Sequence, residues 1–426
     1  MKKAICIPTY NRPEAINELI LRYGKTFKNL DYDIYIFDSS TTDKTSDIVK
    51  EHINNMDHLY YVRINSDVHS NMKVYLIYEE FIKKQEYEYI WVQSDSIRWT
   101  ENALETITKI VDENIYDYII PNHRDVEQIG NKQYNNKDLF LRDCSWCMTL
   151  YGATIVRIKT VFHDIDWNYL NEKYGKSECI NFSHVGLFFE QILRMDGFCA
   201  YHMSLSGSLS STLYKKEPGW RKDTFFVLCE CWPNVIKTIP DSYLYKEEAI
   251  RKIGNCTNEL TVDGLKKLRY DGILDNKTFK KYRSIWKTIS DIPVSTFWFY
   301  SIVPRKIAQY LSKEYWLFKK IKRKLIVFCK NHSDIYIYGC GSKGARVACF
   351  LEEAKIQYKA FVISNHHNDK SSLYNKPVIS FDSSILKKDD SGIIIALNKH
   401  NYNEVIKQFT SEQLKTNILS LGDYEF

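Results

Sequence analysis

The chain has 426 residues, of which 44% are hydrophobic and 14% aromatic, and its formal net charge is +6 at pH 7. This composition excludes a disordered chain, and the length predicts two domains, or two domains and a connector. The charge is too small for this size to imply a nucleic-acid partner. Apolar runs stay shorter than the ~18 residues that a membrane-spanning helix needs.

The cysteine pattern indicates a reducing compartment. Eleven cysteines are an odd number, and "MKKAICIPTYNRP" has too short an apolar run for a secretory segment. We therefore predict free thiols and a cytoplasmic protein. The pairs Cys144–Cys147 and Cys229–Cys231 lack the spacing of a zinc ribbon or finger, which favours thiols in the core over zinc ligands.

The first 120 residues alternate short apolar runs with helical patterns. Between the first two runs, Ile16, Leu19 and Ile20 have helical spacing, with Asn11 as the expected cap and Pro13 in the first turn. Such a succession predicts a mostly parallel sheet flanked by helices. The predicted strands are residues 3–8, 31–38, 58–65, 87–93 and 116–121.

Polar side chains follow several of these strands. Because the carboxyl ends of parallel strands form a ligand crevice, we expect these side chains to lie together. Each aspartate alone is equally consistent with a turn or with a cap, such as Asp95 capping the helix that begins near residue 100. The side chains are Thr9, Tyr10, Arg12, Asp38, Asp67 and Asp95.

The middle of the chain is less regular. Residues 122–142 are expected to form a loop, and residues 145–156 a strand or strand pair. Residues 184–198 follow with a helical apolar face, and His202 lies in a short strand before a loop rich in serine and glycine.

Residues 236–330 read as a helical connector. Its end, residues 304–330, holds nine basic residues against one acid, Glu314, with aromatic residues between them. Basic and aromatic residues on one helix suit an anionic membrane surface, but they also suit the solvated face of a packed helix pair. Both readings stay open.

Residues 331–426 predict a second, smaller α/β domain of Rossmann-like type. Gly339, Gly341 and Gly344 form a G-x-G-x-x-G motif between a strand and a helix, where a dinucleotide phosphate is often bound. The acid expected about twenty residues later is replaced by Ser364 and Asn365. Tight packing of strand and helix is as consistent with the glycines as nucleotide binding.

The stretches "IPTYNRPEAINELI" and "YDIYIFDSSTTDKTSDIV", with an aspartate after the fourth strand and "TENALETI" behind it, resemble the family-2 glycosyltransferases of the GT-A fold. The resemblance covers roughly residues 1 to 230. It implies an inverting transfer of sugar from a nucleotide sugar. We therefore predict a GT-A domain at residues 1–235, the connector at 236–330, and the Rossmann-like domain at 331–426.

The resemblance also assigns donor-binding residues. Asp38 corresponds to the carboxylate that accepts a hydrogen bond from uracil or ribose, and Asp95 to the D-x-D motif, here Ser94-Asp95-Ser96. Lys215 and Trp220 lie in a loop that is expected to close over the diphosphate. The full set is Pro8, Thr9, Tyr10, Arg12, Asp38, Ser40, Asp67, Asn71, Lys73, Ser94, Asp95, Lys215 and Trp220.

Catalysis requires charge neutralisation and a base. The resemblance implies that Mn²⁺ or Mg²⁺ is held by Asp95 and by the distal His202, with the diphosphate supplying further oxygens. Glu190 is the expected general base on the acceptor side. Position in the family pattern alone places Asp143, Trp146 and Tyr151 near the acceptor.

The leading hypothesis is a UDP-sugar glycosyltransferase that acts on a lipid-linked or protein-linked glycan, with peripheral membrane contact through residues 304–330. The alternative is an oxidoreductase or sensor that binds NAD or another nucleotide in the C-terminal domain. A nucleotidyltransferase is disfavoured, because "PTYNRPEA" lacks a glycine-rich basic loop.

Overall fold

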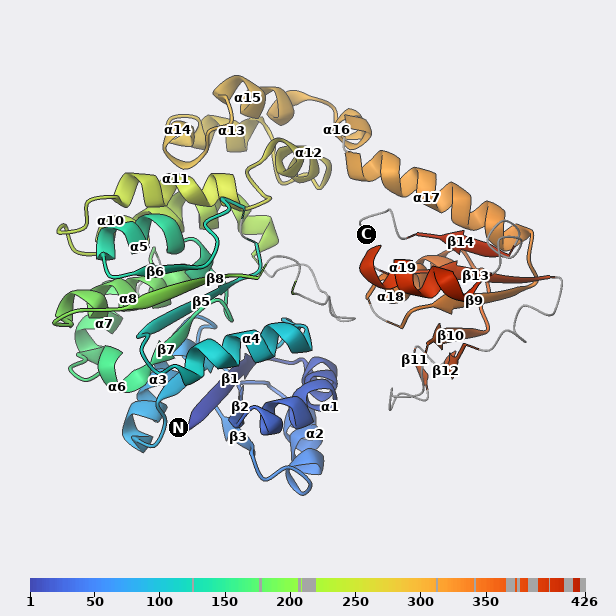
Figure 1. Ribbon diagram of the computed structural model, residues 1–426. Coiled ribbons are helices and arrows are strands. Elements are labelled where there is room, and N and C mark those ends of the chain that lie inside the picture. The colour runs from blue at the N-terminus through green and yellow to red at the C-terminus, as the bar shows by residue number, and fades with distance from the viewer. Residues whose placement is uncertain are drawn as a thin grey trace. The chain divides into compact units, whose positions relative to one another are not determined.

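In the computed structural model, the chain forms two compact units (Figure 1). Along the described residues, the first unit ends at Ala308 and the second begins at Gln309. The described residues are 1–124, 126–175, 178–205, 208, 220–311, 313–340, 342–364, 372–373, 376–381, 390–397, 399–409 and 417–421.

The first unit is built on an eight-stranded sheet with the order β3-β2-β1-β4-β7-β5-β8-β6. The strands β1 to β4 are mutually parallel, β7 runs against β4 and β5, and β5 is parallel to β8. The mostly parallel sheet is thus confirmed. The strands are β1 Lys3–Thr9, β2 Tyr32–Asp38, β3 Leu59–Arg63, β4 Tyr89–Val92, β5 Tyr118–Asn122, β6 Lys132–Tyr134, β7 Ile155–Arg157 and β8 Ala200–Ser204.

Helices cover both faces of this sheet (Figure 1). Successive residues of a strand point to opposite faces, so Ile5 and Ile7 pack in the core that contains α1 and α4, whereas Ala4 and Cys6 pack in the core that contains α3 and α8. The helices are α1 Pro13–Asn29, α2 Lys44–Ile53, α3 Met72–Lys84, α4 Glu101–Asp112, α5 Lys137–Cys144, α6 Ile158–Val161, α7 Trp167–Tyr174 and α8 Ser183–Arg194.

Two expectations for the middle of the chain were wrong. Residues 122–142 are not only loop, because they contain β6 and α5, and the side chain of Asn136 caps α5 by accepting from the N–H groups of Asp138 and Leu139. Residues 145–156 form no strand before β7, since a short 3-10 helix occupies Cys147–Thr149.

The expected cap of α1 was wrong, and the alternative reading of Asp95 as the cap of α4 is excluded. Thr100, and not Asp95, caps α4, because its hydroxyl accepts from the N–H of Ala103 at 3.3 Å. Asn11 does not cap α1; it has a φ of 52°, and its N–H donates to the Ser40 hydroxyl at 2.8 Å. Both Asp95 and Asn11 are therefore left to interact at the edge of the sheet.

A group of helices completes the first unit. Phe297 lies at the centre of its aromatic core. Its ring stacks on that of Trp286, with centroids 3.9 Å apart, and also contacts the rings of Phe225 and Phe279. The helices are α9 Thr224–Phe226, a π-helix at Val227–Cys231, α10 Trp232–Thr238, α11 Lys246–Cys256, α12 Val262–Tyr270, α13 Asn276–Tyr282, α14 Trp286–Ile289, α15 Val294–Ile302 and α16 Arg305–Leu311, which continues past Ala308.

The second unit is a six-stranded sheet with the order β11-β12-β10-β9-β13-β14, parallel except for β11. Ile321, Leu325 and Cys329 of α17 lie in its core. Its elements are β9 Asp334–Tyr338, β10 Ala360–Ile363, β11 Ser372–Leu373, β12 Lys376–Ser380, β13 Ser391–Ile395, β14 Ile418–Ser420, α17 Lys313–Lys330, α18 Ser342–Glu353 and α19 Lys399–Val405.

Two glycines of the G-x-G-x-x-G motif are required by packing. Gly339 has a φ of 109°, a conformation that other residues rarely adopt. A Cβ at Gly344 would lie 1.8 Å from the carbonyl oxygen of Gly339, so α18 approaches β9 as closely as it does only with glycine there. Gly341 lies outside the described residues.

Within the described part of the chain, every helix is too short or too polar to cross a lipid bilayer.

We predict that Gly344→Ala destabilises the second unit by about 2 kcal/mol or more, because the atom that the new methyl group meets is backbone and cannot rotate away. Thermal unfolding followed by circular dichroism measures the change. Gly197→Ala is the control, since nothing lies within 4 Å of its Cβ position. Equal melting curves for both variants would contradict the described contact between α18 and β9.

Candidate functional site

The carboxyl ends of the parallel strands bring polar residues level with one another. In the register of the sheet, Thr9 pairs with Asp38 and Asp38 with Arg63, while β4 ends opposite Cys6 on β1. The backbone of Gln93 continues this edge by donating to the carbonyl of Cys6 at 2.8 Å. The loop that carries Asp95 therefore begins beside Thr9.

Asp95 is a buried carboxylate that both β1 and its following loop contact. Its Oδ2 accepts from the Thr9 hydroxyl at 2.9 Å, and its Oδ1 forms an ion pair with Arg12. Burial raises the pKa of Asp95, while the charges of Arg12, Arg98 and Lys73 and the hydrogen bond from Thr9 oppose this rise. The sequence-predicted residues Thr9, Arg12 and Asp95 are thus in direct contact.

A buried arginine fixes the loop that carries Asp95. Arg98 donates to the backbone carbonyl of Asp95 at 2.7 Å and to that of Ala15 at 2.9 Å, and it forms a buried ion pair with Glu18 of α1. The loop is therefore tied to α1. The carboxylate of Asp95 is held at a defined point of the sheet edge.

Asp38 is completely buried, and both of its oxygens already accept hydrogen bonds. Its Oδ1 accepts from the N–H of Ser40 at 2.8 Å and from the Ser40 hydroxyl, and its Oδ2 accepts from Tyr61 at 2.8 Å and from Arg63 at 3.1 Å. Asp38 thereby orients Ser40 and Arg63 at the edge of the sheet.

Lys73 of α3 places a second cation at the edge. Its ammonium donates to the Ser39 hydroxyl and to the carbonyl of Thr9 at 3.3 Å, and it lies 5.4 Å from the ring centroid of the exposed Tyr10. Burial lowers the pKa of Lys73, and the charges of Asp38 and Asp95 oppose this effect. Pro8, at the end of β1, precedes this group.

Asn71 and Tyr151 are joined at the start of α3. The Tyr151 hydroxyl donates to the side-chain oxygen of Asn71 and to the carbonyl of Ser70 at 3.3 Å. A residue predicted for the donor and one predicted for the acceptor therefore meet. Asp67 lies nearby in the chain but is exposed, and its N–H donates to the Asn65 side chain.

The residues around Asp95 leave one buried acceptor without a partner. The hydroxyls of Ser94 and Ser96 are 2.8 Å apart and interact with each other. The side-chain oxygen of the fully buried Gln93 accepts no hydrogen bond, although its amide reaches the carbonyl of Ile97 at 3.4 Å. Gln93 therefore has an unused acceptor beside the Asp95 loop.

Glu190 is buried on α8 and is contacted by α7. Its Oε1 accepts from the Tyr174 hydroxyl at 2.7 Å and forms an ion pair with Lys173. These contacts do not include the Asp95 group, by which we mean Thr9, Arg12, Lys73 and Asp95. The role of Glu190 as a base stays a prediction.

His202 is fully buried in β8, and both ring nitrogens have protein partners. Since the carbonyl of Gly130 can only accept, Nδ1 donates to it at 2.7 Å, and Nε2 then accepts from the amide of Asn122 at 3.1 Å. Neither of these two contacts involves Asp95, and the role of His202 as a metal ligand also stays a prediction.

The described residues offer a divalent cation one carboxylate, Asp95. In the part of the chain that the structure describes, no three or more histidines, cysteines or acids lie together in a way that could hold a metal ion. Mg²⁺ is often held by one or two carboxylates with water and substrate phosphates. Asp95 fits that pattern once Arg12 shifts from its Oδ1 to a phosphate. A cage made by the protein alone does not fit.

The contacts of Asp143 do not involve Thr9, Arg12, Lys73 or Asp95. Asp143 of α5 is held by Arg142, Lys132, Lys252 and the Tyr134 hydroxyl, and these partners lower its pKa although burial opposes them. Trp146 is buried with an unpaired indole N–H, and Trp220 is partly exposed. Lys215 lies outside the described residues.

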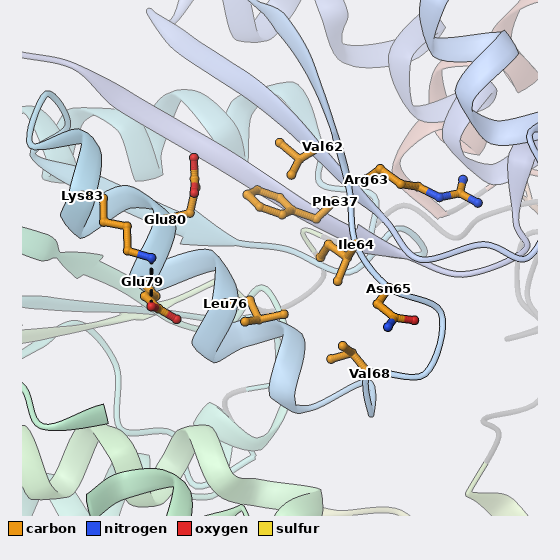
Figure 2. Close-up of a pocket in the computed structure, with 10 residues that line it drawn as sticks. All are labelled: Phe37, Val62, Arg63, Ile64, Asn65, Val68, Leu76, Glu79, Glu80 and Lys83. Atoms are coloured by element: carbon orange, nitrogen blue, oxygen red, sulfur yellow. Dashed lines mark hydrogen bonds and ion pairs between the residues drawn. The ribbon is translucent and has the colours of Figure 1, made fainter. Parts of the chain in front are cut away.

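A cavity of about 320 Å³ lies beside the group, on the side of the sheet that faces α3 (Figure 2). Phe37 lines it, and because neighbouring residues of a strand point to opposite faces, the carboxylate of Asp38 points away from it. Leu76, Glu79 and Lys83 of α3 form its other wall. Arg63 lines the cavity as well and also pairs with Asp38, so the cavity adjoins the β2–β3 end of the edge.

Arg63, Tyr61 and Arg98 were not among the residues selected from the sequence. Arg63 was within reach of the rule that selected Asp38, since it also ends a parallel strand. Arg98 carried no such signal, because its role depends on its burial against Glu18 of a distant helix.

Comparison with known families finds a match over the part of the chain that contains Asp95. Residues 4–169 match the family model of glycosyl transferase family 2. The match includes Thr9, Arg12, Lys73 and Asp95 and supports a glycosyltransferase. A search of the curated proteins finds no relative that matches the chain by sequence.

Solved structures with similar folds include residues 1–349 of S. aureus TarS, with a TM-score of 0.43, 14% identity, and coverage of 76% of this chain and 88% of that chain. The mannosyltransferase PcManGT from Pyrobaculum calidifontis, in complex with GDP-Man and Mn²⁺, has a TM-score of 0.40, 13% identity, and coverage of 76% and 85%. Glucosyl-3-phosphoglycerate synthase from Mycobacterium tuberculosis has a TM-score of 0.37, 10% identity, and coverage of 57% and 81%.

We predict that Arg98→Met lowers the free energy of unfolding by about 3 kcal/mol or more, because Glu18 would remain buried without its cation. Chemical denaturation measures the loss. Arg22→Met is the control: Arg22 contacts the same glutamate at 3.8 Å from a more exposed position, and its removal should change stability by less than about 1 kcal/mol. Equal effects of the two variants would contradict a buried role for Arg98.

We also predict that the contribution of Asp95 to the free energy of unfolding depends on pH. Because the pKa of Asp95 is raised in the folded state, the folded state binds the proton more tightly, and the free energy of unfolding contributed by Asp95 falls as pH rises through the window between the unfolded and folded pKa. Arg12→Gln should widen this window upward. The measurement is the free energy of unfolding from acid to neutral pH, with and without Asp95→Asn, in the wild-type background and in the Arg12→Gln background. If the difference made by Asp95→Asn follows the same pH curve in both backgrounds, the prediction is refuted.

Proposed function

We propose that the protein transfers a sugar from a UDP-sugar to a hydroxyl group of a lipid-linked or protein-linked surface glycan, with inversion at the anomeric carbon. One observation carries the proposal: a buried carboxylate and two cations, Asp95, Arg12 and Lys73, converge at the carboxyl edge of a parallel sheet. Such an edge is where α/β sheets bind ligands.

The two cations suit the diphosphate of the donor. Arg12 presents a planar fork that matches phosphate oxygens, whereas Lys73 acts as a compact point charge. Lys73 is buried between the carbonyl of Thr9 and the hydroxyl of Ser39, so little side-chain freedom remains to be lost when a phosphate binds. When the sugar leaves, the negative charge that develops on the diphosphate meets charges already in position.

The nucleoside half of the donor is assigned to the Asp38 side of the edge. Asp38 has both oxygens occupied, so it acts mainly by orienting Arg63 and Ser40, while Tyr10 offers an exposed ring for stacking. The remaining donor assignments are Pro8, Asp67, Asn71, Ser94, Lys215 and Trp220.

A divalent cation, Mn²⁺ or Mg²⁺, when bound, adds charge neutralisation for the leaving diphosphate. Asp95 would hold it together with donor phosphates. His202 would join only by giving up its hydrogen bond from Asn122.

On the acceptor side, Glu190 is proposed to take the proton from the attacking hydroxyl, which requires Lys173 to release its carboxylate. Asp143, Trp146 and Tyr151 are proposed acceptor contacts. Of these, Tyr151 has the direct link to the donor side, through Asn71. Peripheral membrane contact through residues 304–330 would bring a lipid-linked acceptor to the enzyme.

We predict that the protein binds UDP, and that Lys73→Met weakens binding by about tenfold or more, since a charge-assisted contact to phosphate is lost. Isothermal titration calorimetry with UDP, in the presence and absence of Mn²⁺, measures the effect. Lys83→Met is the matched control, because Lys83 lies on the same helix in an exposed ion pair with Glu79.

In the same preparation, Asp95→Asn and Glu190→Gln should each slow UDP-sugar hydrolysis or transfer by about a hundredfold. Glu190→Gln should leave the affinity for UDP unchanged. Heat evolved with NAD but not with UDP would favour the alternative function in the C-terminal unit, and full turnover in both variants would refute the assigned residues.

A further inference from the structure

The outward face of α15 is apolar. Trp298, Phe299 and Ile302 follow one another at helical spacing and are 47%, 43% and 43% exposed. Water-facing helix surfaces normally carry polar residues, and clustered exposed apolar residues mark a binding surface. Here, the buried face of the same helix is apolar as well, with Phe297 and Tyr300.

This face is presented by a firmly packed helix. Phe297 stacks on Trp286 behind it, and Arg269 donates to the carbonyl of Val303 at 2.6 Å where α15 ends. The Ser301 hydroxyl donates to the carbonyl of Trp298 at 2.7 Å. The exposure of Trp298 and Phe299 is therefore a fixed feature of the first unit, and not the fraying of a loose helix.

Cations lie directly after the apolar face. Arg305, Lys306 and Ile307 are all exposed at the start of α16, and Ile307 is 47% exposed. The side chain of Arg305 packs over Gly272, which keeps its charge close to the group of helices. From residue 292 to residue 313 the sequence contains no aspartate or glutamate, so this stretch itself carries only positive charge.

We propose that Trp298, Phe299, Ile302 and Ile307, with Arg305 and Lys306, form a docking face for the surface of an anionic lipid bilayer. Tryptophan and phenylalanine enter the interface between headgroups and acyl chains, while arginine and lysine pair with anionic headgroups. Docking uses both attractions together, as peripheral binding commonly requires.

Charge favours a bilayer over a second copy of the chain. In a symmetric dimer through this face, the two sets of Arg305 and Lys306 would approach each other. Like charges brought together oppose such a dimer. An anionic lipid surface offers these cations a complementary charge.

The inference depends on the proposed function in one respect, that the acceptor is carried by a membrane. It places the membrane contact at α15 and the start of α16, and not along the whole of residues 304–330. Vesicle binding requires no sugar donor. A failure of lipid binding is therefore distinguishable from a failure of UDP binding, which calorimetry measures separately.

The test is flotation of the full chain with vesicles of phosphatidylcholine alone and of phosphatidylcholine mixed with phosphatidylglycerol. We expect binding to the mixed vesicles, weakened by added salt, and a loss of affinity of about tenfold or more in Trp298→Ser/Phe299→Ser. Ile115→Ser/Leu244→Ser is the matched control, because it removes side chains that are 54% and 75% exposed elsewhere on the first unit.

Circular dichroism must show equal melting of both double variants, and light scattering reports the oligomeric state. Lys306→Gln should weaken binding to the anionic vesicles without affecting melting. Absence of wild-type flotation, equal flotation of the two double variants, or a dimer that Trp298→Ser/Phe299→Ser converts to a monomer would each overturn the proposal.

Discussion

The burial of one negative charge, that of Asp95, is the constraint on which the site depends. A carboxylate removed from water is costly unless hydrogen bonds and cations compensate for it. Thr9 and Arg12 compensate at the carboxylate, and Arg98 at the backbone of the same residue. These contacts come from β1, from the loop before α1, and from the loop after β4, so satisfying Asp95 fixes three segments relative to one another.

The same compensation gives the edge its chemical character. Arg12, Lys73, Arg63 and Arg98 lie around two buried carboxylates, Asp38 and Asp95, and each cation has at least one acceptor among them or in the backbone. An anionic ligand that takes Arg12 leaves the buried Asp95 carboxylate without that cation, so Asp95 must then bind another cation or a proton. A diphosphate that arrives with a divalent cation, as proposed, meets this requirement.

Much of this arrangement could be predicted from the sequence, because it follows from the order of strands. The apolar runs located the parallel strands, and the rule that their carboxyl ends meet selected Thr9, Tyr10, Arg12, Asp38, Asp67 and Asp95. Thr9 and Arg12 contact Asp95 directly, whereas Asp67 is exposed. Glu190 shows where that reasoning ends. Its helix was foreseen, but its burial against Lys173 and Tyr174 of α7 was not, because no local pattern encodes that contact.

The errors have a similar physical origin. Residues 145–156 have strand-like composition, yet only the last two pair in β7, since the preceding turn is set by tertiary contacts: Gly152, with a φ of 98°, donates to the carbonyl of Val92, and its own carbonyl accepts from the indole of Trp91. Residues 145–156 thus support the Asp95 loop from beneath, because a Cβ at Gly152 would lie 2.8 Å from the side chain of Ile97. The segment that composition assigned to the sheet instead helps to shape the loop that carries the buried carboxylate.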